Sequence, residues 1–331
     1  DIAATRLPRA LTLSALVAEL RVALTDPHSP RGRREAAAVQ LRRLADAGVP
    51  GADPSQWWGL ADLSDSRPLV DDGEQIVVTP STVEIVDRCS LRWLLERNGG
   101  RDAPSPEQNV GNLVHDAAMR AEDAATVDRA DLVTYVVGRF GEIELSARWL
   151  ADRERDRAEK MIDKLIGWLG SNPRRLSAIE RDFVAQLDAD IQIRGRVDRL
   201  EVDDAGRLVV IDLKTGKTVP RDVDIAENGQ LAAYQAAVEA GAFDDVGSVS
   251  GGAALVQLGA SAASAKEQRQ PDLAAADDPT WAAELVRRTA RTMAASTFHA
   301  IANSRCRNCP VRHACPITGK GRQVTGDGET S

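Results

Sequence analysis

Two acids and a lysine at the ends of two predicted strands constrain this chain more than any other feature. Residue spacing predicts a β-hairpin, with strands over 190–202 and 207–213 and a turn through Asp, Asp, Ala and Gly at 203–206. Asp198 lies on the first strand. Asp212 and Lys214 lie two residues apart on the second, so their side chains point to the same face of the sheet. The sequence therefore predicts two carboxylates and one ammonium group close together.

Such a group of charges can hold a divalent cation and position a water molecule beside it. A simpler interpretation makes Asp198 a surface acid and Asp212–Lys214 an exposed salt bridge. However, Asp212 directly follows four apolar residues, at the core boundary, where an unpaired charge is unfavourable. Mg²⁺ or Mn²⁺ is the natural counter-charge for clustered carboxylates. Lys214 can then orient or help deprotonate a water molecule and stabilise phosphate charge.

Composition sets only broad limits. The 331 residues suffice for one large domain or two, and the net charge of −8 argues against nucleic-acid binding only as a global average. The tail from 305 to 331 carries five basic residues against two acidic ones. We find no signal peptide and no apolar run long enough to span a bilayer, which favours a cytoplasmic protein without a membrane partner.

Four cysteines form an asymmetric set. Three of them lie in Cys306-x2-Cys309-x5-Cys315, and Cys89 lies far upstream. Buried apolar cysteines are the simpler interpretation, but three within ten residues, mixed with polar residues, are typical of a metal site. Four thiolates can bind Zn²⁺ or a [4Fe–4S] cluster. One isolated ligand and three clustered ones favour the cluster, which we expect to tie residue 89 to the C-terminal tail.

The rest of the chain reads as helices, then a small mixed sheet, then helices, which indicates an α/β or α+β core. We expect Ser81 to be the N-cap of the third predicted helix and Glu84 to complete a capping box. Residues 260–278 are rich in Ala, Ser and Asp and are expected to form a mobile loop. Predicted helices cover 11–24, 32–47, 81–97, 109–124, 130–140, 144–169, 227–240 and 279–296, and further predicted strands cover 76–78, 177–187 and 251–258.

Four more polar residues are ambiguous when each is taken alone. A single helical histidine such as His115 is usually structural. Gln230 and Tyr234 share a helix face at i and i+4, where packing and surface residues are common. Glu180 lies on a predicted strand and has no partner that the sequence can identify. Their meaning depends on the pattern that they form together.

Together these residues resemble the RecB-family nuclease domain of the PD-(D/E)xK superfamily. The matching motifs occur in the family's order over about 79–325: Gly111-x-x-x-His115, Gly195-x-x-Asp198-Arg, Asp212-x-Lys214-Thr-Gly and Gln230-x-x-x-Tyr234. The four cysteines resemble the iron–sulfur form of that domain found in AddB-type and AdnAB-type helicase–nucleases and in Cas4-like proteins. The resemblance implies a restriction-endonuclease-like α/β core, with a small central mixed sheet flanked by helices and a periphery stapled by the cluster.

The resemblance also implies roles for the site residues. His115, Asp198, Asp212 and the backbone carbonyl of Leu213 would bind Mg²⁺ or Mn²⁺, and Lys214 would be the catalytic lysine. Gln230 and Tyr234 would support the site and the DNA backbone, and Glu180 would be an additional acid used by some members. Cys89, Cys306, Cys309 and Cys315 would hold the iron–sulfur cluster, with Zn²⁺ as the alternative.

The function implied is cleavage of single-stranded DNA delivered by a helicase motor during double-strand-break resection in bacteria, close to the nucleoid. We expect residues 1–75 to be a helical segment that ends a helicase region, plus a linker, and residues 76–331 to be the nuclease domain with its Cys-rich tail. Because the chain begins at Asp1, we expect a fragment of one subunit of a two-subunit complex. The alternatives are a non-catalytic DNA-binding or scaffold module of a repair complex and a stand-alone Cas4-like exonuclease.

Overall fold

A computed structural model describes residues 12–57, 66–100, 105–142 and 148–318. The chain divides into two compact units. The smaller comprises residues 1–67 with 305–331, and the larger comprises residues 68–304. Within the described residues, no helix is both long enough and apolar enough to cross a membrane.

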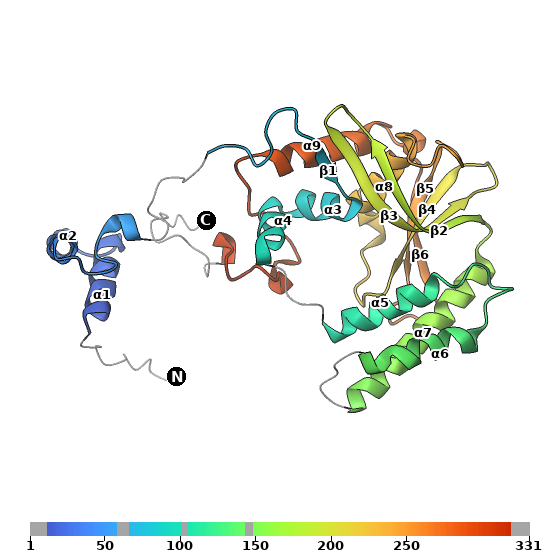
Figure 1. The fold of residues 1–331 in the computed structure, drawn as a ribbon, viewed down its shortest axis with the longest axis horizontal. Coiled ribbons are helices and arrows are strands. Elements are labelled where there is room, and N and C mark those ends of the chain that lie inside the picture. The colour runs from blue at the N-terminus through green and yellow to red at the C-terminus, as the bar shows by residue number, and fades with distance from the viewer. Residues whose placement is uncertain (1–11, 58–65, 101–104, 143–147, 319–331) are drawn as a thin grey trace. The chain divides into compact units, whose positions relative to one another are not determined.

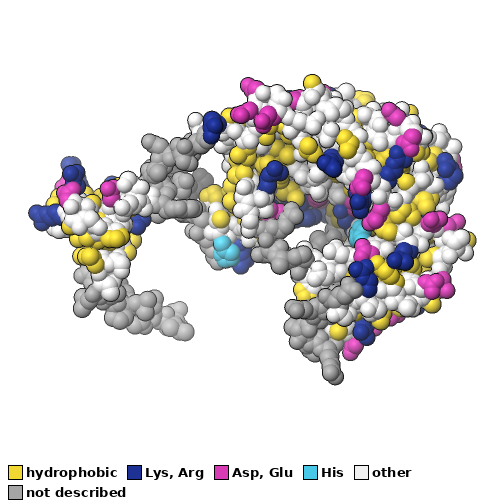
Figure 2. Space-filling model, viewed as in Figure 1, with side chains coloured by type: hydrophobic (Ala, Val, Ile, Leu, Met, Phe, Trp, Pro, Cys, Tyr) yellow, Lys and Arg dark blue, Asp and Glu magenta, His cyan; other side chains and the backbone are white. Residues whose placement is uncertain are grey.

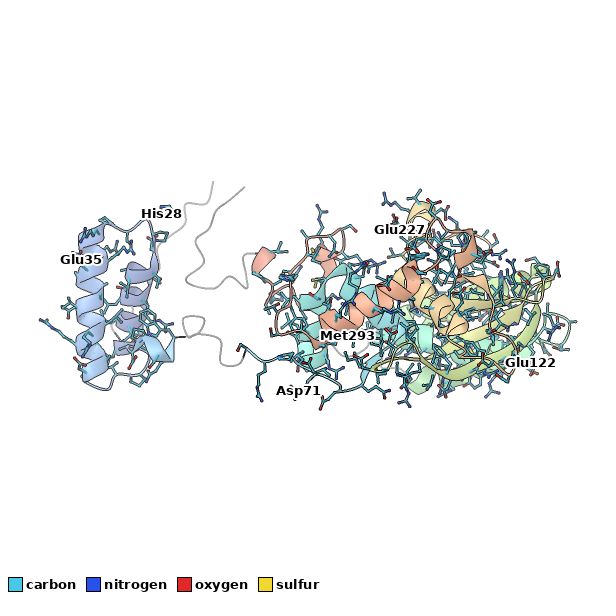
Figure 3. The ribbon with its side chains drawn as sticks, turned by 90° about the horizontal axis from the view of Figure 1, so that it is seen from above. His28, Glu35, Asp71, Glu122, Glu227 and Met293 are labelled. Atoms are coloured by element: carbon cyan, nitrogen blue, oxygen red, sulfur yellow. The ribbon has the colours of Figure 1, made fainter. Side chains whose placement is uncertain are left out.

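The smaller unit contains two consecutive helices, α1 (Leu13–Thr25) and α2 (Arg31–Asp46). Thr12 caps α1, because its side chain accepts a hydrogen bond from the backbone N–H of Ala15. Figure 3 shows His28 at the connection between the helices and Glu35 on α2. A small apolar cluster joins the helices to the segment that follows them, and its buried members are Val17, Leu41, Ala52 and Trp57.

The larger unit is built on a six-stranded mixed sheet (Figure 1). Its strands run in the order β1–β3–β4–β5–β6, and β2 pairs with β3 outside this path. The pairs β1–β3 and β4–β5 are parallel, and the other pairs are antiparallel. The strands are β1 (Ile76–Val78), β2 (Arg175–Gln186), β3 (Ile191–Val202), β4 (Leu208–Lys214), β5 (Ser250–Gln257) and β6 (Lys266–Gln270).

Helices cover both faces of the sheet, and β4 shows why. Along β4 the side chains alternate between two apolar clusters: Leu208 and Val210 join one, and Val209, Ile211 and Leu213 join the other. The first cluster includes α3 (Pro80–Arg88), α8 (Gly229–Glu239) and α9 (Trp281–Ala294), and the second includes α5 (Pro106–Ala118), α6 (Arg129–Arg139) and α7 (Arg148–Ser171). This arrangement confirms the predicted α/β fold class, a central mixed sheet flanked by helices.

The predicted hairpin is present as β3 and β4. Its turn closes with Gly206 at a φ of 80°, a left-handed conformation that glycine adopts without strain. Asp203 stabilises the turn, because its carboxylate accepts hydrogen bonds from the backbone N–H groups of Ala205 and Arg207. The turn sequence therefore sets the register that aligns the two acidic strand ends.

Two predictions about residues 79–97 are wrong. The predicted helix 81–97 is broken at Cys89, which has an extended backbone, and α4 (Ser90–Leu95) starts after it. The N-cap of α3 is Thr79 rather than Ser81, since the Thr79 hydroxyl accepts from the backbone N–H of Thr82 and Pro80 takes the first helical position. α9, on which Figure 3 labels Met293, packs along α3.

The segment predicted as a mobile loop, 260–278, contains strand β6. Its amide side chains are buried and satisfied by other parts of the unit, which is why an apolar pattern is not needed to form this strand. Gln268 donates to the carbonyl of Pro220 and to Asp222, and Gln270 donates to three backbone carbonyls between 225 and 228.

Candidate active site

The hairpin places its two acids side by side at the end of the β3–β4 ladder. Arg199 pairs with Ile211, so the next step of this antiparallel register sets Asp198 opposite Asp212. Asp198 Oδ2 accepts a hydrogen bond of 2.7 Å from the backbone N–H of Leu213. Asp212 is 5% exposed, because alternation along β4 turns it toward α8. The two carboxylates therefore share one partly desolvated region.

Helix α8 supplies two polar side chains to this region. Gln230 Nε2 donates to Asp212 Oδ1 at 2.7 Å, and Gln230 Oε1 accepts from Lys214 Nζ at 2.8 Å. The Tyr234 hydroxyl lies 3.3 Å from the same Asp212 oxygen, one helical turn from Gln230. Asn228 caps the helix by accepting from the backbone N–H of Leu231, which fixes where α8 begins beside the hairpin. The structure thus brings together the four residues of the two downstream motifs.

One oxygen of Asp212 lacks a hydrogen bond among the described residues. Asp212 Oδ2 is buried, and although Lys214 Nζ lies 2.7 Å away, the contact does not have the angles of a hydrogen bond. The ammonium of Lys214 therefore offsets the charge of this buried oxygen without an aligned hydrogen bond, and a bound cation would share the oxygen with it.

His115 reaches the acids from the other side of the sheet, on α5. Its Nδ1 lies 3.8 Å from Asp198 Oδ2, within ion-pair range but beyond a hydrogen bond. The close approach of α5 depends on Gly111, since a Cβ atom there would lie 2.6 Å from Thr215 Oγ1, a contact that does not occur without rearrangement. This explains the glycine of the Gly111-x-x-x-His115 motif: it lets the helix that carries the histidine pack against the end of β4.

The electrostatics of the site follow from this crowding. Burial, followed by the negative charge of Asp212, raises the pKa of Asp198 to about 6. Burial alone would lower the pKa of Lys214, but the carboxylate of Asp212, with smaller contributions from Glu84 and Asp198, raises it above its ordinary value. Lys214 is therefore an ammonium ion at neutral pH. Burial and then the charges of Asp212 and Asp198 raise the pKa of Tyr234 well above its usual value, so its hydroxyl stays protonated.

These groups open into a cavity of about 390 Å³. The predicted residues that line it are His115, Asp198, Asp212, Leu213, Lys214, Gln230 and Tyr234. Figure 2 shows a hollow on this face of the larger unit between α3 and α5, with Lys and Arg side chains beside it. A substrate can therefore reach the two carboxylates and the ammonium group together.

The donor set fits an oxygen-bound divalent cation. Two neighbouring carboxylates, one with a buried oxygen that makes no aligned hydrogen bond and one with a raised pKa, are the groups that a cation would neutralise. Within the described residues, no three His, Cys, Asp or Glu side chains already stand in a metal-binding arrangement. His115 and the carbonyl of Leu213 as further ligands stay predictions, since only the N–H of Leu213 has a contact with an acid here.

Glu180 does not line the cavity. It lies on β2 with a φ of 45°, and its side chain is 45% exposed. Its nearest partner is Arg196, with Nη1 3.9 Å from Glu180 Oε2, and Arg196 itself lines the cavity. A role for Glu180 would therefore act through Arg196, which the sequence analysis did not single out.

The cysteines fall in both units. Cys89 is buried in the larger unit at the break between α3 and α4, with its Sγ 3.7 Å from the carbonyl of His299. Cys306, Cys309 and Cys315 are half-buried in the smaller unit, within and beside short 3₁₀ turns. The iron–sulfur cluster and its zinc alternative stay predictions.

Besides Arg196, other residues that line the cavity were given no role in the site by the sequence. Thr79 and Ser81 line the cavity from the start of α3, and Thr215 lines it from the end of β4. The signal for Thr79 was present, since Thr-Pro-Ser before a helical pattern is typical of a helix start. Nothing local in the sequence places the start of α3 beside β4, because that contact depends on tertiary packing.

A family model described as the PD-(D/E)XK nuclease superfamily matches residues 77–316. No curated protein matches the chain. Among solved structures, the chain is similar to one titled "Crystal structure of SSO0001", with 14% sequence identity, 74% of this chain and 88% of that chain covered, and a TM-score of 0.35.

Proposed function

Because the chain belongs to the PD-(D/E)XK nuclease superfamily, we propose that it is a metal-dependent deoxyribonuclease that hydrolyses DNA phosphodiester bonds in the cavity beside β3, β4 and α8. One observation carries the proposal. Asp198, Asp212 and Lys214 line the same cavity, and Gln230 hydrogen-bonds both Asp212 and Lys214. Acids and an ammonium group held in this way suit a reaction in which negative charge develops on a phosphate.

Each side chain has a role that follows from its contacts. Lys214, kept protonated by Asp212, donates to phosphate oxygens and stabilises their developing charge. Gln230 fixes the directions of Asp212 and Lys214. Tyr234, a neutral donor beside Asp212, keeps that carboxylate oriented.

A divalent cation, Mg²⁺ or Mn²⁺, would be held by Asp198 and Asp212 and would supply Lewis-acid activation of water and phosphate. Asp198 would then be ionised at neutral pH despite its raised pKa, because a cation favours the charged carboxylate. His115, whose Nδ1 lies 3.8 Å from Asp198 Oδ2, would join the same ligand set.

We further propose that this nuclease belongs to a helicase–nuclease of the AdnAB or AddB type. The four motifs in RecB-family order and the set of Cys89, Cys306, Cys309 and Cys315 support this proposal. On this proposal residues 1–75 end a helicase region, residues 76–331 form the nuclease domain, and the cysteines bind a [4Fe–4S] cluster. Its partners would be single-stranded DNA, a helicase motor and a second subunit, near the bacterial nucleoid.

A cleavage assay tests the nuclease proposal. The chain is incubated with labelled single-stranded and double-stranded DNA in EDTA, Mg²⁺ or Mn²⁺. We expect metal-dependent cleavage by the wild type and none by Asp212→Ala, with unchanged circular dichroism. The matched control Asp204→Ala removes an exposed acid from the turn of the same hairpin and should cleave like the wild type. Full activity of Asp212→Ala would overturn the assignment, and a wild type that binds but never cleaves DNA would favour a non-catalytic module.

A further inference from the structure

A second cavity, of about 900 Å³, lies between α7 and the segment 258–263 in the larger unit. We call it the α7 groove. Five basic side chains line it, against the two acids Asp156 and Asp163: Arg153, Arg157, Lys160, Lys164 and Lys217. The chain has a net charge of −8 and only six lysines, so three of its lysines on one groove form a strong local concentration of positive charge.

Consecutive residues of the chain line the catalytic cavity and the α7 groove. Thr215 and Gly216 line the catalytic cavity, and Lys217, the next residue, lines the groove. Arg157 on the groove side donates from Nη2 to the carbonyl of Thr215 at 2.6 Å. A polymer whose scissile bond lies beside Lys214 can therefore continue over this segment into the groove.

The cations divide into two groups by their contacts. Arg157 and Lys164 are held by contacts within the protein and form the wall of the groove. Arg157 pairs with Glu154, and Lys164 donates to the carbonyls of Leu258 and Ala260. Burial, followed by the charges of Arg157 and Lys160, lowers the pKa of Lys164, which shows how closely the cations are gathered. The Nε of Arg157 is buried and has no acceptor in the described part of the chain.

The other cations are available to a ligand. Arg153, Lys160 and Lys217 are exposed, and none of them pairs with a carboxylate anywhere in the described ranges. Of the two acids, Asp163 is already paired with Arg129 on α6. The groove therefore presents unneutralised positive charge to a polyanion.

Its size and lining indicate which polyanion. At 1.5 Å per residue, Arg153 and Lys164 lie about 17 Å apart along the axis of α7, or about five nucleotides at duplex spacing. The described lining includes no aromatic side chain on which a base could stack. Contacts would therefore be made to phosphates rather than to bases, without sequence preference.

We propose that the α7 groove binds the sugar–phosphate backbone of the single DNA strand whose scissile phosphate lies in the catalytic cavity. This inference rests on the proposed nuclease function for its substrate. The groove sets the position of the strand relative to Asp198, Asp212 and Lys214, and so determines how much DNA on that side a productive substrate must have.

The test measures binding in EDTA, so that it does not depend on cleavage. The probe is a fluorescent oligothymidylate of roughly 15 nucleotides, titrated over a series of salt concentrations. The variant Lys160→Gln/Lys217→Gln removes two exposed cations and leaves both wall residues intact. The control Lys266→Gln removes a lysine that pairs with Asp222 outside the groove.

We expect the double variant to bind about tenfold more weakly at low salt and to lose about 1.4 from the slope of log affinity against log salt, or 0.7 for each phosphate contact. Lys266→Gln should match the wild type. Unchanged affinity and slope in the double variant would overturn the proposal. Poly-glutamate serves as a second probe. If the double variant loses binding to poly-glutamate and still binds DNA like the wild type, the groove is a site for acidic peptides and the proposal is overturned. Because binding and cleavage are measured separately, a wild type that binds through the groove without cleaving would refute the nuclease proposal alone.

Discussion

Without a metal, the ionised Asp198 destabilises the folded protein, because folding raises its pKa. The substitution Asp198→Asn should remove this destabilisation. In Asp198→Asn the side chain keeps its shape and can still accept from the backbone N–H of Leu213, but it carries no charge. Folding raises the pKa of this carboxyl from 3.8 to about 6, and one pKa unit corresponds to about 1.4 kcal/mol. The ionised Asp198 therefore lowers the free energy of unfolding by up to about 3 kcal/mol.

The sign of the pH dependence follows from the direction of the shift. The folded state holds this proton more tightly than the unfolded state, so the penalty is absent below pH 3.8. It grows as pH rises between 3.8 and about 6 and is complete above that range. The ionisable groups that face Asp198 are Asp212, His115 and Lys214, and the first of these contributes most to the shift after burial.

Urea unfolding in EDTA measures this effect. At about pH 7.5 we expect Asp198→Asn to be more stable than the wild type by roughly 2–3 kcal/mol, and at about pH 4 most of that difference should vanish. Asp204→Asn, which removes an exposed acid from the same hairpin, is the control for loss of one charge. With Mg²⁺ added, the wild type should gain stability and the variant should not. An equal difference at both pH values, or a less stable variant at pH 7.5, would refute the reasoning.

Three further predictions follow from other contacts. Gly111→Ala should lower the free energy of unfolding by about 1–3 kcal/mol, because the new Cβ would meet Thr215. Gly138→Ala in α6, where the new Cβ has open space, should raise the free energy of unfolding by up to about 1 kcal/mol. Thermal unfolding of both variants checks these values. Gln230→Leu should reduce kcat at least tenfold with the fold retained, since Asp212 and Lys214 lose the amide that orients them, and wild-type kinetics would contradict that role. Anaerobically purified protein should be brown, absorb near about 400 nm and contain iron, and Cys309→Ser should lose the colour; a colourless protein with stoichiometric zinc would exclude the cluster.

The hairpin could be predicted from the sequence because its information is local. Alternation along β4 and the turn at Gly206 determine which residues face α8, and both are visible in the sequence. The pairing of β4 with β5 joins segments separated by the whole of α8, so no local pattern contains it. The same holds for the 3.8 Å approach of His115 to Asp198, which the family resemblance suggested and spacing could not.

Polar residues account for the local errors. Strand β6 has no strand pattern in the sequence because its buried side chains are amides, whose hydrogen bonds to distant groups replace apolar packing. Thr79 and Ser81 are similar N-cap candidates, and the choice between them depends on Pro80, which fits the first position of a helix. Partners outside the segment therefore decide the structure of β6, whereas a neighbouring residue decides the cap of α3.

Helix α8 has a consequence for how the protein loses activity. Residues 229–238 of this helix are all buried, so Gln230 and Tyr234 stand on an element inside the core and not on a surface loop. The backbone amides of such a helix exchange with solvent deuterium mainly when the whole unit unfolds. Heating should therefore abolish activity at the same temperature at which the unit melts, without an earlier step in which the site alone loosens. The lifetime of the active site is then the lifetime of the native fold.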